Sequence, residues 1–235
     1  MTSQVLHFGS EKIEFKVGYS SRKSLGISVN PDLSVDVRAP HGASMLKIHE
    51  KVKKRAPWII KQRARFERYP QKRSERRYVS GESFFYLGRQ YRLKVIKAAE
   101  TKATLSRGIF TVHIVNKDTG GSVRKVVEKW LRERAVIYFQ KRLETLLIKL
   151  KYHGVQLPIL QLKMMPKRWG SCTKGGKIIL NPNLIKAPSH CIDYVIMHEL
   201  CHLVIHNHSP EYWSLLKKVM PDWRARKERL EMIEI

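Results

Sequence analysis

The sequence is poor in cysteine, in acidic residues and in long apolar runs, and each shortage excludes a class of protein. Three cysteines cannot all pair with one another, and none belongs to a C-x-x-C pair, which favours free thiols and a reducing compartment. No apolar run approaches the roughly 20 residues that cross a bilayer. Residues 1–9 lack the basic and apolar segments of a secretory signal. We therefore expect a cytoplasmic protein.

Acidic residues are outnumbered more than two to one, because 46 Lys and Arg stand against 20 Asp and Glu in 235 residues, a net charge of +26. A field of that size favours polyanionic partners such as nucleic acid or nucleotide phosphates. Thirteen of the cations, against three acids, fall between residues 47 and 77. This basic segment is typical both of a solvated helix face and of a nucleic-acid-binding surface.

The amino-terminal half is predicted to be rich in strands. Residues 12–38 show the alternation of a small antiparallel sheet, and strands resume between residues 83 and 115. Between them a helix begins after the cap residue Ser44, and Pro57 is expected to break or restart it. A turn-rich cluster at residues 118–121 marks the predicted junction between a region 1–119, which contains this one long helix, and a region 120–235.

The carboxy-terminal half alternates helices with short strands. Helical spacing predicts an amphipathic helix from Ser122 to about residue 152, ended near Gly154. Strands at residues 159–164 and 177–180 bracket a predicted loop at 167–172. Ser189 then offers a cap to the next helix. The chain as a whole is predicted to be α+β.

The most specific pattern is HELCH at residues 198–202. Histidines four positions apart leave the same face of a helix, so His198 and His202 can share one metal ion, and Glu199 lies beside them. A chance match with satisfied histidines is the competing interpretation. However, the rest of this helix is largely apolar, so its polar strip is expected to be buried or to face a cleft. Buried polar groups need partners, and a metal would supply one.

The third ligand is predicted to be His208, at the spacing of the H-E-x-x-H-x-x-G-x-x-H pattern. Three protein ligands leave one position open for water, as in catalytic zinc sites. Ile205 occupies the glycine position of that pattern, so we expect the turn at Asn207, which tolerates a left-handed conformation. Rival ligands on the following residues are His206, Glu211 and Glu228.

A set of short motifs extends over nearly the whole chain. They are RWGSC at 168–172, NPNL at 181–184, DYVIMHELCH at 193–202, NHS at 207–209 and PDW at 221–223, with RAP at 38–40, GE at 81–82 and LGR at 87–89. Together they resemble the YgjP-like metal-dependent hydrolases, zinc peptidases related to the SprT-like group. The resemblance implies that His208 is the third ligand. It also implies a zincin-like region, with the motif helix packed on a small antiparallel sheet, preceded by the strand-rich basic amino-terminal region.

The chemistry predicted from these residues is metal-dependent hydrolysis. Zinc, or another divalent transition metal, would lower the pKa of a bound water to about 7, and Glu199 would act as general base. The first prediction is a metallopeptidase acting on a peptide or protein. In it an extended substrate pairs with an edge strand at residues 177–180, and Arg168 or Tyr212 stabilises the oxyanion.

Two alternatives follow from the same residues. The activated water can attack phosphorus, so a phosphoanhydride hydrolase acting on a nucleoside triphosphate is the second prediction. The third is a nucleic-acid-binding protein with a structural metal, in which a protein side chain such as Cys172 fills the fourth position. Nucleic acid at the basic segment is a further predicted partner, and no membrane association is expected.

Overall fold

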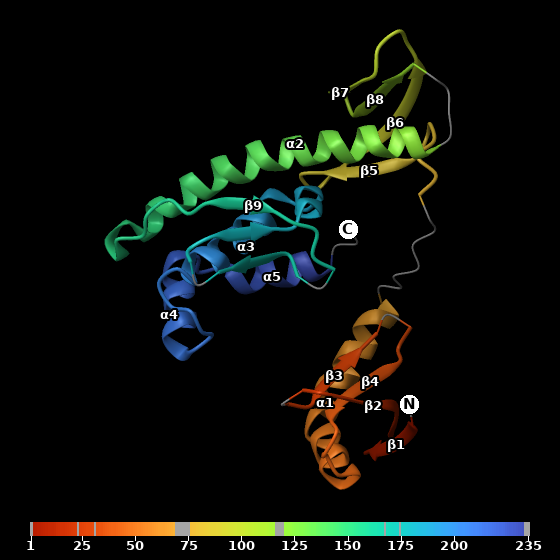
Figure 1. Cartoon of the computed structure of the whole chain (residues 1–235), viewed down its shortest axis with the longest axis vertical. Helices are drawn as coiled ribbons and strands as arrows, with labels where there is room; N and C mark the ends of the chain where they lie inside the picture. The colour runs from red at the N-terminus through yellow and green to blue at the C-terminus, as the bar shows by residue number, and fades with distance from the viewer. Residues whose placement is uncertain are drawn as a thin grey trace. The chain divides into compact units, whose positions relative to one another are not determined.

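The computed structural model describes residues 2–22, 24–30, 32–68, 76–115, 120–166, 168–173 and 175–232. The chain forms two compact units, Met1–Ser74 (unit 1) and Glu75–Ile235 (unit 2) (Figure 1). The sequence placed the junction after residue 119, in a turn cluster of which residues 118 and 119 lie outside the described residues. The units divide earlier because Phe84 and Phe110 belong to the same core as Trp130.

Unit 1 is a four-stranded sheet with one helix against it (Figure 1). Its elements are β1 (Thr2–Phe8), β2 (Glu11–Ser20), β3 (Gly26–Val29), β4 (Val35–Pro40) and α1 (Met45–Arg68). The strand order is β1-β2-β4-β3, and β2 runs parallel to β4, so the sheet is mixed rather than antiparallel as predicted. The core between sheet and helix comprises Ile13, Phe15, Val17, Val35, Val37, Ala39, Ile48, Val52, Ala56 and Ile59.

Helix α1 begins where the sequence predicts and continues through Pro57. Ser44 precedes it, and its carbonyl accepts from the Ile48 N–H at 3.1 Å. Pro57 removes one helical N–H, but the buried positions Val52, Ala56 and Ile59 follow one another across it at helical spacing. Packing of this stripe against the sheet therefore keeps the helix continuous.

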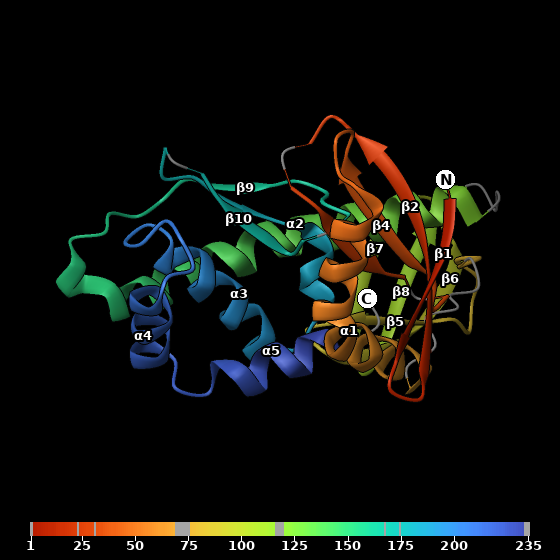
Figure 2. The ribbon, with the colours of Figure 1, turned by 90° about the horizontal axis from the view of Figure 1, so that it is seen from below.

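The first part of unit 2 is a second mixed sheet. It contains β5 (Ser83–Tyr86), β6 (Arg89–Lys97), β7 (Lys102–Ser106) and β8 (Ile109–Ile114) in the order β5-β6-β8-β7. The long helix α2 (Gly120–Leu147) packs against β7 and β8 and also against the later part of the unit (Figure 2). It passes into a 3₁₀ segment, η1 (Ile148–His153), and ends at Gly154 with φ of 66°, as predicted.

The second part of unit 2 carries the motif. It contains β9 (Leu160–Leu162), β10 (Gly170–Cys172), β11 (Ile178–Leu180), the 3₁₀ segment η2 (Pro182–Lys186), α3 (Ser189–Cys201), α4 (Pro210–Val219) and α5 (Trp223–Glu231). The sheet order is β10-β11-β9, with β9 parallel to β11. Two predictions were wrong here. Residues 170–172 form a strand rather than a loop, and β11, predicted as an edge, is the central strand.

The motif helix α3 lies deep in unit 2. Its residues from Cys191 to Met197 are buried, as are Glu199, Leu200 and Cys201. Pro188 occupies the N-cap position, so Ser189 is the first residue of the helix rather than its cap. The three cysteines are free thiols. None of the helices in the described ranges combines the length and apolar character needed to cross a membrane.

Candidate metal centre

Three imidazole rings converge at the carboxy-terminal end of α3. His198 lies in the last turn of the helix, and His202 follows its final residue in the helical conformation. The His208 Nε2 atom lies 3.2 Å from the Nε2 atoms of both other rings. Among the described residues these three histidines form a group whose donor atoms all lie within 4.8 Å of one another. The structure therefore brings together the three predicted ligands.

The chain turns between His202 and His208 without a left-handed residue. Asn207 is absent from the residues with positive φ, so the prediction of a left-handed turn there was wrong. The turn is made earlier, where the N–H groups of Val204 and Ile205 both bond to the Cys201 carbonyl at 3.1 and 2.9 Å. Ile205 occupies the position of the metzincin glycine with ordinary negative φ.

Hydrogen bonds at the outer edges of two rings fix which nitrogen is free. The Tyr212 hydroxyl donates its single hydrogen to the His198 carbonyl at 3.1 Å. Its oxygen can therefore only accept from the His198 ring, so the hydrogen in the 2.7 Å contact belongs to His198 Nδ1. The His202 Nδ1–H donates to the Ile205 carbonyl at 3.1 Å. With hydrogen on Nδ1, the Nε2 lone pairs of both rings point to the centre.

This donor set fits a divalent transition metal. Lone pairs of Nε2 atoms held 3.2 Å apart repel one another, and a cation between them removes that repulsion. Imidazole nitrogen suits zinc and neighbouring metals, and ligating histidines characteristically donate their other N–H to a protein group. Burial and the neighbouring rings lower the His198 pKa to about 3, so this ring is neutral and ready to bind at physiological pH. Burial likewise lowers the His202 pKa.

Aromatic side chains of α4 and α5 support the most exposed ligand, His208. The Trp213 ring stacks on the His208 ring at 5.4 Å between centroids, and its Nε1–H donates to the His208 carbonyl at 3.2 Å. Trp223 stacks in turn on Trp213 at 4.9 Å. The Trp213 indole therefore packs against the ring of His208 and bonds to its backbone.

Glu199 is buried beside the histidines, with 5% of its surface exposed. Burial raises its pKa to about 7, although the Cys172 backbone N–H, which hydrogen bonds to the carboxylate, and the nearby Arg168 charge both act to lower it. Such a carboxylate can take up and release a proton near neutral pH.

Gly170 in β10 is required by the position of Glu199. A Cβ atom on Gly170 would lie 2.6 Å from Glu199 Oε1 and 2.8 Å from its Cγ. Strand β10 thus passes directly over the carboxylate, and only glycine permits this approach. Sequence reasoning placed residue 170 in a loop and missed this role.

The loop before β10 is anchored by Asn181, which is also buried. Its side-chain amide donates to the Met165 carbonyl at 2.8 Å and the Arg168 carbonyl at 3.4 Å, and its oxygen accepts from the Asn183 N–H. The anchor sets the start of β10 and leaves the Arg168 side chain exposed near Glu199.

An ion pair fixes α3 to α2. The Arg142 guanidinium donates to both oxygens of Asp193 at 2.7 and 2.8 Å. Arg226 of α5 approaches the same carboxylate at 3.8 Å. Asp193 lies one and a half turns before His198, so this pair orients the end of the helix that carries His198. Nothing in the motif itself indicated the pair, because Arg142 is 51 residues away in the sequence.

The remaining predicted residues fall outside the cluster of imidazoles. His206, Glu211 and Glu228 are exposed, and none belongs to the group of three close donors. Tyr212 is fully buried with its hydroxyl bonded to His198. Burial of Cys172, and to a lesser extent the neighbouring Glu199 charge, raises the pKa of its thiol to about 11. Cys172 is not among the grouped donors.

We compared the chain with known protein families, curated proteins and solved structures. The sequence matches the family described as YgjP-like, metallopeptidase domain, over residues 23–232. Among solved structures it is similar to the crystal structure of the metallopeptidase zymogen of Pyrococcus abyssi abylysin, at 23% identity and a TM-score of 0.36, over 39% of this chain and 90% of that chain. No curated protein matches it. The matched residues include the three histidines, Glu199 and β10.

Proposed function

Because the chain belongs to the YgjP-like metallopeptidase family, we propose that it is a zinc-dependent peptidase with a zincin-like site. The observation that carries this proposal is the convergence of three Nε2 atoms next to a buried glutamate and an edge strand. His198, His202 and His208 would hold the metal through Nε2. Zinc bound there supplies a Lewis acid that polarises the scissile carbonyl and acidifies the attacking water.

Glu199 is proposed as the general base. Its raised pKa of about 7 lets it accept a proton from the attacking water and then release that proton to the leaving amine nitrogen. The Cys172 N–H holds the carboxylate, and Gly170 leaves room for it. Its burial keeps bulk water from competing for the proton.

Strand β10 is proposed as the substrate-binding edge. The Trp169 carbonyl accepts from the Asn181 N–H and the Thr173 N–H donates to the Lys177 carbonyl, at the residues that flank β11. Ser171 is paired with Ile179 between them. In an antiparallel ladder the intervening residues direct their backbone groups away from the partner strand, so those of Gly170 face the open edge. An extended peptide can pair there. The central strand β11 cannot serve, because β9 and β10 occupy both of its edges.

Arg168 is proposed to stabilise the oxyanion, and Tyr212 to position His198. Arg168 is exposed, precedes β10 and lies close enough to Glu199 to lower its pKa. The buried Tyr212 hydroxyl is instead committed to the His198 ring and carbonyl. Arg168→Gln is therefore expected to lower kcat with little change in zinc content.

The experiment that tests the function uses the zinc-loaded protein and its Glu199→Gln variant. We expect both to contain one zinc per chain, and only the wild type to cleave an unfolded protein, with a loss of about 10²- to 10⁴-fold in the variant. Nucleoside triphosphates are assayed in parallel. Phosphate or pyrophosphate release without peptide cleavage would replace the peptidase with a phosphoanhydride hydrolase. Unchanged hydrolysis in the variant would remove Glu199 from the mechanism.

A further inference from the structure

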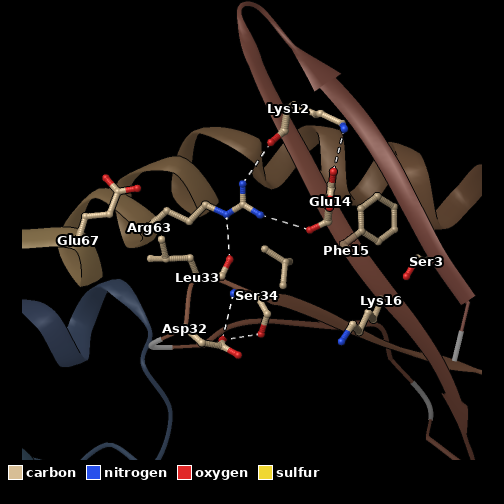
Figure 3. Close-up of a pocket in the computed structure, with 11 residues that line it drawn as sticks. Ser3, Lys12, Glu14, Phe15, Lys16, Asp32, Leu33, Ser34, Arg63 and Glu67 are labelled. Carbon is tan, nitrogen blue, oxygen red and sulfur yellow. Dashed lines mark hydrogen bonds and ion pairs between the residues drawn. The ribbon is translucent and has the colours of Figure 1, made fainter. Parts of the chain in front are cut away.

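The cations of α1 whose side chains the structure describes fall into two groups, of which the first contains Arg63 alone. Its guanidinium donates to the carbonyls of Leu33, Lys12 and Glu14 at 3.1, 3.2 and 3.3 Å, beside a cavity of about 400 Å³ (Figure 3). These carbonyls belong to β2 and to the turn before β4, where Leu33 has a φ of 66°. Arg63 therefore completes the fold of unit 1 and is not free to bind a ligand.

The second group is exposed and unpaired. Its six members, which form no hydrogen bond through their side chains and no ion pair with any described residue, are Lys47, Lys51, Lys53, Lys54, Arg55 and Lys61. Glu50 and Glu67 are the acidic residues of this helix. Lys47, Lys51 and Arg55 succeed one another at intervals of four residues, so their like charges repel along one face. A bound polyanion would remove that repulsion.

A groove beside this column contains an exposed tryptophan. Leu25, Ile27, Lys51, Arg55 and Trp58 line a cavity of about 330 Å³ between α1 and the β3 edge of the sheet. Trp58 is 37% exposed, although the next residue, Ile59, is fully buried. A solvated helix face accounts for the cations alone, whereas this groove places the partly exposed indole of Trp58 beside two of those cations and two apolar side chains.

We propose that this groove binds single-stranded nucleic acid, with one base stacked on Trp58 and neighbouring phosphates at Lys51 and Arg55. A positively charged groove with an aromatic platform is the arrangement that binds single strands without reading their sequence, since every base offers a flat face. In a duplex the bases are already stacked on each other, so the indole would have no free base to contact. The site lies wholly in unit 1 and is independent of the proposed peptidase activity.

Titration of the full-length protein with a labelled oligothymidylate of about 15 nucleotides tests the proposal, since sites of this type cover roughly 4–16 nucleotides. We expect binding in the micromolar range or tighter at low salt, with log affinity falling linearly with log salt concentration. Trp58 is the one tryptophan of five that lies in unit 1, so the quenching of its fluorescence on binding should vanish in Trp58→Phe.

Two variants separate stacking from charge. Trp58→Ala should weaken binding roughly 5- to 150-fold, because stacking one base contributes about 1–3 kcal/mol. Lys51→Ala with Arg55→Ala should flatten the salt slope by about 1.4, because each lost phosphate contact removes about 0.7. The matched control is Lys125→Ala with Lys141→Ala, two exposed cations of α2 whose removal changes the net charge equally. It should leave the slope almost unchanged.

Several outcomes would overturn the proposal. They are equal binding by wild type and all variants, an equal loss in the α2 control, and tighter binding of a duplex of the same length. Displacement of the oligonucleotide by polyglutamate at an equal concentration of charges would identify an acidic peptide as the partner instead. Thermal unfolding of each variant verifies that unit 1 remains folded, and Trp58→Phe with normal affinity but without quenching still supports the assigned contact.

Discussion

Helices α3 and α1 differ in the burial and in the partners of their polar side chains. In α3 the groups Asp193, His198 and Glu199 lie in a buried surrounding, and each has a defined partner. In α1 one stripe is buried, while six cations are exposed and form no ion pair with the part of the chain that the structure describes. Chemistry at a bond requires groups that are desolvated and fixed before the substrate arrives. Binding of a flexible polyanion requires hydrated charges that can adjust. The two helices fit these two requirements.

The sharpest test of fixed geometry in α3 is Gly170→Ala. The added Cβ would meet the Glu199 carboxylate at 2.6 Å, so the carboxylate or β10 must move. We expect peptide cleavage to fall about 100-fold or more, with zinc content unchanged, because displacements of about 1 Å cost that much. Gly175→Ala is the control, since its nearest new neighbour is Thr173 Oγ1 at 4.0 Å. Equal activity of the two variants would show that β10 adapts.

Tyr212→Phe tests the partner of the first ligand. The variant keeps the ring but removes the hydroxyl that accepts from His198 Nδ1–H, so the ring loses its orientation. We expect zinc affinity to fall about 10- to 100-fold in a competition titration with a chelating dye. Tyr194→Phe is the control, because the Tyr194 ring also lies near His198 but its hydroxyl forms no hydrogen bond with the described residues. Similar affinities in both variants would contradict the positioning role.

Asp193→Asn and Glu133→Gln together compare the contribution of a partly buried ion pair to stability with that of an exposed pair. Asp193→Asn weakens two short bonds from Arg142 in a partly buried setting, so we expect the free energy of unfolding to fall by roughly 2 kcal/mol. Denaturant titration measures this. Glu133→Gln breaks an exposed pair with Lys129 and should change stability by less than about 0.5 kcal/mol. If the two losses match, the Arg142 pair does not fix α3.

The pH dependence of metal-free stability gives the smallest effect. Folding raises the Glu199 pKa from 4.5 to about 7, so the folded protein binds more protons than the unfolded chain between these values, and this group makes stability fall as pH rises through the window. Glu199→Gln does not titrate there. We expect the variant to gain roughly 1–2 kcal/mol relative to wild type between pH 6 and pH 8. A difference independent of pH would show that Glu199 titrates normally.

Local spacing was sufficient to predict which histidines cluster but not what surrounds them. His198, Glu199 and His202 lie within one turn, and helix geometry alone places them on one face. His208 followed from the spacing of a known pattern. The role of Gly170 depends on β10 crossing α3, and a three-residue strand that begins with glycine has no alternation to detect. The pairing of Arg142 with Asp193 depends on tertiary packing in the same way.

The fold was predicted in its elements more than in its assembly. Most strands and helices were expected near their observed positions, although β1 and α5 were not predicted. Each of the three sheets is mixed, which alternation within single strands cannot show. The junction was misplaced because a turn cluster indicates a loop and not a division of cores. Packing of Phe110 on Trp130 across that loop joins β5–β8 to the metal-site unit.

The Tyr212 hydroxyl bonds to both the ring and the carbonyl of His198, and His208 is held by Trp213, so residues on either side of one turn depend on each other. A metal ion at the three imidazoles would act as a cross-link between α3 and α4. We therefore expect amide hydrogens of α4 to exchange faster after chelation, while those of α1, which belongs to the other unit, keep their rates. Metal occupancy would thus be measurable as slower hydrogen exchange in a short helix that carries none of the three histidines but supports two of them, His198 through Tyr212 and His208 through Trp213.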